Sequence, residues 1–276
     1  PTLTSFGNDG VASQPVGKTP SMHDNPLGTN LSRRALLAGS LGAGLTMTAV
    51  DRSLASPTST VSDSTFSTAA LTVLATTDIH GHVFDWDYFA DAAFPPSDKG
   101  RSSAPLGVSR VATIAKQVRA EQGADSVVML DNGDTIQGTP LTYLSAKQPD
   151  KLGHDEVMAR AFNLVGYDAA NIGNHEFNYG VAELFRYHND LKAPLLCANV
   201  IDVKTGKPLT QGSLMLTKNV AGHEVKVGIV AVTTPGSMVW DKANLVGKVD
   251  IADPVKTAAR YSVRLRKDGA DVVVVL

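Results

Sequence analysis

Short apolar runs alternate with stretches of helical periodicity from Leu71 to the end of the chain. Strands are predicted at residues 71–75, 126–130, 168–172, 195–199 and 271–276, and a hairpin at 214–220 and 225–232 around Ala221-Gly222-His223. Helices are predicted at 108–118, at 155–164 with His154 as the cap, and from Asp253-Pro254 to about Gly269. Strands that alternate with helices in this way predict an α/β fold, in which helices cover a sheet.

The first 69 residues lack this periodicity. Residues 1–31 are rich in Ser, Thr, Asn, Gly and Pro, and Arg33-Arg34 then precedes a glycine-interrupted apolar stretch at 35–50. That stretch is shorter than the about 20 apolar residues that a membrane-spanning helix needs. The paired arginines, the weakly apolar core and the small-residue segment Ser53-Leu54-Ala55 follow the order of a twin-arginine export signal. The alternative is an amphipathic or anchoring segment, or a pair of arginines that occurs by chance.

Three regions are therefore predicted: a disordered leader with a twin-arginine signal at 1–55, a Ser- and Thr-rich linker at 56–69, and a folded domain at 70–276. The twin-arginine export machinery is an expected partner. The protein is expected in the periplasm, the cell wall or the extracellular space, with no stable membrane span after cleavage of the signal. Because the chain begins at Pro1 and stops at Leu276 within an apolar run, it is interpreted as a piece of a longer protein.

Composition narrows the chemistry that the folded part can perform. The 276 residues are 43% hydrophobic and 19% charged, which is enough apolar material for a sizeable core. The formal net charge of -2, from 25 basic and 27 acidic residues, lacks the positive excess typical of proteins that bind nucleic-acid polymers. A single cysteine, Cys197, excludes an internal disulfide and a thiolate zinc site. Any bound metal must therefore use His, Asp, Asn or Glu.

Three of the predicted strands are followed by clusters of polar residues. The clusters are Thr77-Asp78-Ile79-His80-Gly81-His82, Asp131-Asn132-Gly133-Asp134 and Gly173-Asn174-His175-Glu176-Phe177. Loops at the carboxyl ends of strands in an open α/β sheet converge on one crevice, so the three clusters are expected to meet. Taken singly, each has a simpler explanation: a chance Asp-x-His, a Gly-Asp turn, or an Asn that caps a helix.

Taken together, the clusters supply the ligands that hard divalent ions prefer. Asp78 and His80, separated by one residue, can point the same way, and Asp134 can bridge two cations with its two oxygens. Asn174 adds a neutral amide oxygen. Such a set suits two ions about 3.5 to 4 Å apart, which bind a phosphate and hold a water in line for attack.

These motifs resemble the successive blocks of the calcineurin-like metallophosphoesterases. The blocks are Asp78-Ile79-His80, Gly133-Asp134 with Gln137-Gly138 after it, and Gly173-Asn174-His175-Glu176. The forms Gly-Asp-Thr-Ile-Gln-Gly and Gly-Asn-His-Glu-Phe are similar to those of the nucleotidase branch, and the resemblance extends from Leu71 to Leu276. It implies a four-layer α/β/β/α sandwich that is truncated at its C-terminus.

The resemblance also implies a role for each motif residue. Asp78 and His80 would bind the first metal ion, Asp134 would bridge both ions, and Asn174 would bind the second. His175 would stand beside the phosphate and stabilise or protonate the leaving oxygen. The ions would be Mn, Zn, Co or Fe, and the family supplies further metal-binding histidines and a base-binding domain that would lie beyond Leu276.

One position departs from the 5'-nucleotidase pattern. In that pattern an Asp orients the catalytic His, whereas this chain has Asn178, followed by Tyr179-Gly180. An amide can hold one tautomer of His175 but cannot stabilise an imidazolium as a carboxylate would. The Asn-Tyr-Gly continuation resembles exported enzymes that hydrolyse 2',3'-cyclic nucleotides and 3'-nucleotides. Alternatively, Asn178 is an ordinary helix cap before Val181.

The preferred hypothesis is an exported two-metal phosphoesterase that hydrolyses 2',3'-cyclic nucleotides and 3'-nucleotides with a metal-activated water. Two alternatives stay open. One is a 5'-nucleotidase or UDP-sugar hydrolase on the same scaffold, and the other is an inactive cell-envelope binding module of the same fold. A nucleotide is the expected small-molecule substrate in the first two cases, and no nucleic-acid polymer is expected as a partner.

Overall fold

The computed structural model describes residues 69–94 and 106–276. The predicted leader at 1–55, with its export signal, lies outside the described residues, as does all but the last residue of the predicted linker at 56–69. Both regions stay predictions.

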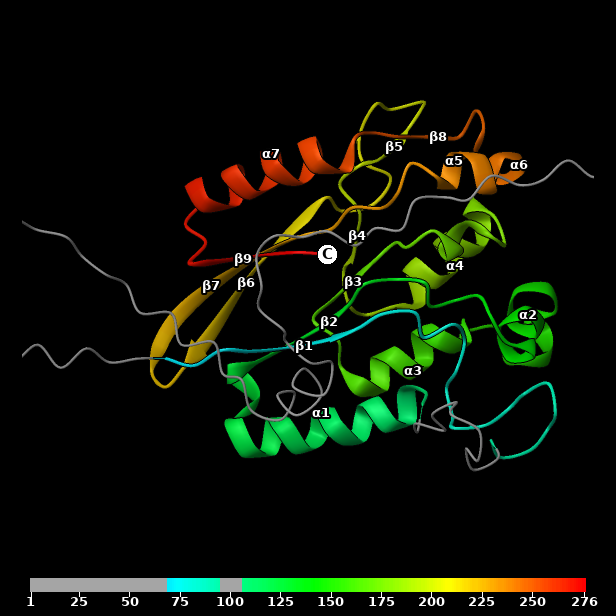
Figure 1. Ribbon diagram of the computed structural model, residues 1–276, viewed down its shortest axis with the longest axis horizontal. Helices are drawn as coiled ribbons and strands as arrows, with labels where there is room; N and C mark the ends of the chain where they lie inside the picture. Colours follow the sequence, from blue (N-terminus) through cyan, green and yellow to red (C-terminus); the bar gives the residue numbers. More distant parts are fainter. Residues whose placement is uncertain (1–68, 95–105) are drawn as a thin grey trace, which may run out of the picture. The chain divides into compact units, whose positions relative to one another are not determined.

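The first sheet is parallel and has the strand order β1-β2-β3-β4 (Figure 1). Its strands are β1 (Thr72–Thr76), β2 (Val127–Asp131), β3 (Ala169–Asn171) and β4 (Leu195–Leu196). The connections contain α1 (Val108–Gln122), α2 (Pro140–Lys147), α3 (Val157–Val165) and α4 (Val181–Asp190). Every residue of β2 is buried, which explains its continuous apolar run, since helices or a second sheet cover both faces of such a strand.

The second sheet joins a hairpin to the last strand. It consists of β6 (Ser213–Val220), β7 (His223–Val230) and β9 (Val272–Val275), with β6 antiparallel and β9 parallel to β7. The remaining elements are β5 (Val200–Asp202), which pairs with β8 (Val249–Ile251), and the helices α5 (Ser237–Trp240), α6 (Lys242–Leu245) and α7 (Pro254–Lys267). As predicted, Asp253 caps α7: its side chain accepts a hydrogen bond from the backbone N–H of Lys256.

Side-chain alternation along β2 shows how the layers pack. Met129 belongs to the core formed with α1, α3 and α4, whereas Val128 and Leu130 pack against the β6-β7-β9 sheet. On the far face of that sheet, Val230 packs with Leu265 of α7. The order is therefore helices, first sheet, second sheet and helix, which confirms the predicted four-layer α/β/β/α sandwich (Figure 1).

Three local predictions need correction. The fourth strand was expected at 195–199 but ends at Leu196, because the backbone N–H groups of Cys197 and Ala198 donate to Gln211 and Ala231 outside the first sheet. The helix expected at 155–164 is capped by Glu156 and not by His154, because the Glu156 carboxylate accepts from the N–H of Ala159.

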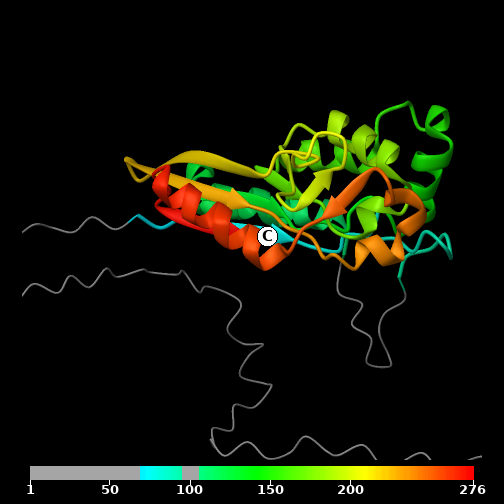
Figure 2. The ribbon, with the colours of Figure 1, turned by 90° about the horizontal axis from the view of Figure 1, so that it is seen from above.

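The third correction concerns the hairpin, in which His223 lies in β7 and not in the turn. Ala221 and Gly222 have positive φ values of 51° and 83°, as a tight two-residue hairpin turn requires, so His223 pairs with Val220. Both views of the fold show this turn at one end of the domain and α2 at the other (Figures 1 and 2).

Candidate functional site

The loops that follow β1 and β2 are joined by three backbone hydrogen bonds. The N–H of Asp78 donates to the carbonyl of Gly133 over 3.1 Å, and the N–H of His80 donates to the carbonyl of Asp134 over 2.9 Å. Gly81 repeats the pattern one residue on, with its N–H 2.9 Å from the carbonyl oxygen of Thr135. The first two polar clusters of the sequence therefore lie side by side.

The loop that follows β3 closes on the same place, and two glycines allow it to do so. A Cβ added to Gly133 would lie 2.3 Å from the backbone nitrogen of Gly173, and one added to Gly173 would lie 2.3 Å from Asp134 Oδ1. Any larger residue at either position would push the loops apart. The backbone N–H of His175 donates to Asp134 Oδ1 over 2.8 Å. All three polar clusters thus converge, as predicted.

Glu176 ties two of these loops together, a role that the sequence analysis missed although it quoted the residue. The carboxylate is fully buried and accepts from the backbone N–H groups of Asp134, Thr135, Ile136 and Gly173. Burial raises the pKa of Glu176 above its ordinary value, and the hydrogen bonds from the backbone of Thr135, Asp134 and Ile136 offset only part of this rise. A carboxylate within a glycine-rich loop was the available signal, because such loops expose backbone N–H groups to an anion.

The backbone itself is unusual at the predicted ligands. Asp78, His80 and Asp134 have positive φ values of 55°, 47° and 59°, in the left-handed region that residues other than glycine rarely occupy. Such conformations persist where surrounding contacts hold them, and they are concentrated at functional sites. The three inter-loop hydrogen bonds supply those contacts here.

Hydrogen bonding determines which nitrogen of His80 faces its neighbours. His80 Nδ1 lies 2.9 Å from the carbonyl oxygen of Gln137. A carbonyl can only accept, so Nδ1 carries the hydrogen, and in the neutral imidazole Nε2, 3.7 Å from Asp78 Oδ1, has the lone pair. Metal-binding histidines are oriented in this way by a backbone carbonyl on the nitrogen that does not bind.

One ligand atom each from His80, Asp134 and His175 lies within 4.8 Å of the other two. The rings of His80 and His175 meet edge to face, with their centroids 4.9 Å apart. This cluster of two imidazoles and a carboxylate fits a divalent metal ion. It includes His175, which the sequence analysis placed beside the phosphate. Which of these side chains coordinate metal stays a prediction.

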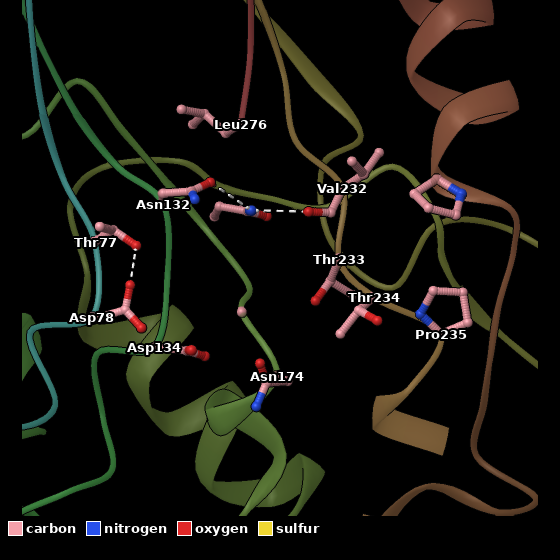
Figure 3. A pocket seen from close by; sticks show the side chains of 13 residues that line it. Thr77, Asp78, Asn132, Asp134, Asn174, Val232, Thr233, Thr234, Pro235 and Leu276 are labelled. Atoms are coloured by element: carbon pink, nitrogen blue, oxygen red, sulfur yellow. Dashed lines mark hydrogen bonds between the residues drawn. The ribbon is translucent and has the colours of Figure 1, made fainter. Parts of the chain in front are cut away.

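The other two predicted ligands line the same cleft as Asp134, a cavity of about 440 Å³. Figure 3 shows Asp78, Asp134 and Asn174 on one side of it and Thr233, Thr234 and Pro235 on the other. Asn174 stands where a capping residue would, but its side chain makes no capping hydrogen bond. By position Asn174 is thus the N-cap of the short helix His175–Phe177, and its amide, which makes no capping hydrogen bond, also lines the cleft.

Asn178 is not the residue that caps α4. The capping position of α4 is occupied by Gly180, and Asn178 Oδ1 lies 2.7 Å from His175 Nδ1. The residue that replaces the aspartate of the 5'-nucleotidase pattern thus contacts the imidazole of His175.

Within residues 69–94 and 106–276, no helix is both long and apolar enough to cross a membrane.

No protein-family model matches the chain. It is 40% identical over 222 residues to the 2',3'-cyclic-nucleotide 2'-phosphodiesterase/3'-nucleotidase of Yersinia enterocolitica, an alignment that covers 79% of this chain and 32% of that protein. The 5'-nucleotidase of Vibrio parahaemolyticus is 30% identical over 200 residues, which cover 72% of this chain and 31% of that protein.

A solved structure has the same fold as this chain. The calcineurin-like phosphoesterase YfkN from Bacillus subtilis superposes with a TM-score of 0.66 at 33% identity, over 75% of this chain and 61% of that chain. The Yersinia enterocolitica protein and two further relatives with the same name extend well beyond the aligned region, since the alignments cover 32%, 30% and 31% of their lengths. The chain thus spans about a third of the length of these curated relatives.

Proposed function

We propose, from the membership of this chain in the calcineurin-like metallophosphoesterase family, that the full protein hydrolyses nucleotide phosphoesters with the help of two divalent metal ions. The observation that carries this proposal is the convergence of three strand-end loops, which brings His80, Asp134 and His175 together in a cluster suited to a metal, next to a cleft that Asp134 lines. The relatives are named as nucleotidases and nucleotide phosphodiesterases, which supports a nucleotide as the substrate.

In this proposal Asp78 and His80 hold the first ion, Asp134 bridges both and Asn174 holds the second. Divalent ions there would supply positive charge to the phosphate oxygens and would lower the pKa of a water molecule. Mn, Zn, Co and Fe all accept such imidazole and oxygen ligands, so the donor set leaves the choice among them open.

Two residues of the chain, Gln137 and Asn178, orient the histidines of the site. Gln137 keeps the His80 proton on Nδ1, so that Nε2 is free to bind. Asn178 Oδ1 lies against Nδ1 of His175, which leaves Nε2 as the nitrogen available to the substrate. In the imidazolium form, Nε2–H of His175 can donate its proton to the leaving ribose oxygen, which is general acid catalysis.

The preferred substrates in this proposal are 2',3'-cyclic nucleotides and 3'-nucleotides. Support comes from Asn178, which stands where a 5'-nucleotidase has Asp, and from the names of the relatives that are 37 to 40% identical to the chain over the aligned residues. The 5'-nucleotidase relatives favour a 5'-nucleotidase or UDP-sugar hydrolase as the second candidate. An inactive binding module is disfavoured, because a chain without activity has no need of all five site residues.

A side-by-side comparison of a 2',3'-cyclic, a 3'- and a 5'-monophosphate of one nucleoside tests this preference. The first two are expected to have kcat/KM values at least about tenfold above the third, which is ~1.4 kcal/mol of transition-state stabilisation. A preference for the 5'-compound would support the second candidate. No turnover of any nucleotide by metal-loaded, full-length protein would indicate another phosphoester or the binding module.

We also propose that the protein is exported in a folded state, with 1–55 as the leader, 56–69 as the linker and 70–276 as part of the catalytic domain. Support comes from Arg33-Arg34 in the leader, since twin-arginine signals are an address that a dedicated export machinery reads. Changing both arginines to lysine is expected to leave the protein in the cytoplasmic fraction, whereas Arg52→Lys, a control nearby, is expected to change nothing. Export that continues in the double variant would assign the leader to the route for unfolded chains.

A further inference from the structure

Asp241, which is in none of the sequence motifs, contacts Asn178, the residue that contacts His175 in the proposed active site. It lies between α5 and α6 and is 8% exposed. Both of its carboxylate oxygens accept from Nδ2 of Asn178, each over 3.0 Å. Three groups therefore form a continuous series from Asp241 through the Asn178 amide to Nδ1 of His175.

The direction of each hydrogen bond in this series follows from chemistry. An ionised carboxylate only accepts, so the NH2 group of Asn178 must face Asp241. The amide oxygen is then turned toward His175, and because that oxygen also only accepts, His175 Nδ1 must carry a hydrogen. The reversed amide would place its oxygen against two carboxylate oxygens, which repel it.

The surroundings hold the series in place. Asn244 on α6 donates from Nδ2 to the carbonyl oxygens of Phe177 and Asn178, over 2.9 and 3.2 Å. The N–H of Asn244 in turn donates to the backbone carbonyl of Asp241 over 2.8 Å. The segment from α5 to α6 is thus bonded to the His175 loop by the side chains of Asn244 and Asp241.

We propose that Asp241 is a positioning residue that fixes the orientation of the Asn178 amide and, through it, the Nδ1–H tautomer of His175. Asp241 does not touch the substrate. In the 5'-nucleotidase pattern a carboxylate contacts the catalytic histidine directly. Here the carboxylate of Asp241 contacts the Asn178 amide, and the amide contacts His175. Its effect on catalysis rests on the proposed function, whereas its effect on the tautomer does not.

The tautomer can be read directly in the full-length, Zn²⁺-loaded protein by two-bond ¹H–¹⁵N spectra of ¹⁵N-histidine. The His175 signals are assigned by their absence from His175→Ala. We expect a pure Nδ1–H form in the wild-type protein and in the control Asp268→Asn, which changes an exposed carboxylate at the end of α7. Asp241→Asn is expected to give a mixture, because two facing amides can pair in either direction. An unchanged Nδ1–H form in Asp241→Asn would overturn the proposal, whether or not the protein hydrolyses nucleotides.

Kinetics test the consequence for turnover. Asp241→Asn is expected to lower kcat about tenfold with little change in KM, as the loss of residues that orient active-site histidines does. In a His175→Ala background the same change is expected to lower kcat no further, since the effect passes through His175. An equal loss in both backgrounds would show that Asp241 acts on the fold and would contradict the proposal.

An exchange of the two side chains provides a rescue. In Asp241→Asn combined with Asn178→Asp, a carboxylate at 178 accepts from His175 Nδ1 and from the new amide at 241. The double variant is expected to regain the pure Nδ1–H tautomer and most of the lost kcat. A double variant that folds, by its thermal unfolding profile, but still gives the mixed tautomer would count against the proposal.

Discussion

Changing Asp134 to alanine is expected to reduce the metal content of the full-length protein from about two ions per chain to one or fewer. The carboxylate of Asp134 is the proposed bridge between the ions, and His80, Asp134 and His175 form the cluster in which a metal fits. Because charge stabilisation by bound metal contributes several kcal/mol, kcat/KM should fall by about 10³-fold or more. Elemental analysis after dialysis against Mn²⁺ or Zn²⁺ measures the first effect.

A matched variant separates the charge of Asp134 from its part in the loop structure. Asp134→Asn keeps an oxygen that can accept from the N–H of His175, so the loop contact survives while the negative charge is lost. Metal loss in both variants would assign the effect to the charge. If the wild-type protein holds one ion and Asp134→Ala holds the same ion, the bridging role is wrong.

The second large effect is expected from His175→Ala, which should lower kcat by about 10²- to 10⁴-fold, the usual cost of a lost general acid. The metal content should stay near that of the wild-type protein, because the contact between position 175 and Asp134 uses a backbone N–H that alanine retains. Turnover and elemental analysis of the same preparation provide both numbers. His154→Ala, an exposed histidine outside the cluster, is the control.

The geometry makes this experiment decisive. The His175 imidazole lies close enough to His80 and Asp134 to act as a ligand, yet the sequence motif assigns it to the phosphate. Loss of metal from His175→Ala would make it a ligand, and the general acid would have to be another group. Loss of turnover with metal retained would support its place beside the phosphate.

The first sheet could be predicted from the sequence because each strand carries its own signal. β1 and β2 each lie within one residue of the predicted range, since their apolar runs are bounded by polar loops. The site residues could be located for the same reason: they follow directly on strands whose parallel pairing brings their ends together.

The parts that could not be predicted depend on contacts between distant segments. Asp241 lies 63 residues from Asn178 and carries no motif, so only the folded chain reveals that they pair. Glu176 was visible within its motif, but three of its four partners are N–H groups of another loop. The early end of β4 likewise depends on carbonyl groups of Gln211 and Ala231, far along the chain.

The bonding between the three strand-end loops has a thermodynamic consequence. Asp134 and His175 come together only when β1, β2 and β3 have paired, so an unfolded chain has no equivalent arrangement of ligands. Metal binding would then be linked to folding, and free metal at about 1,000 times its dissociation constant would add about 4 kcal/mol to the free energy of unfolding. Domains of this kind are stable by only about 5–15 kcal/mol in total. A chelator would therefore act on this domain as a denaturant does, and the metal supply where the chain folds would set the fraction of chains that stay folded.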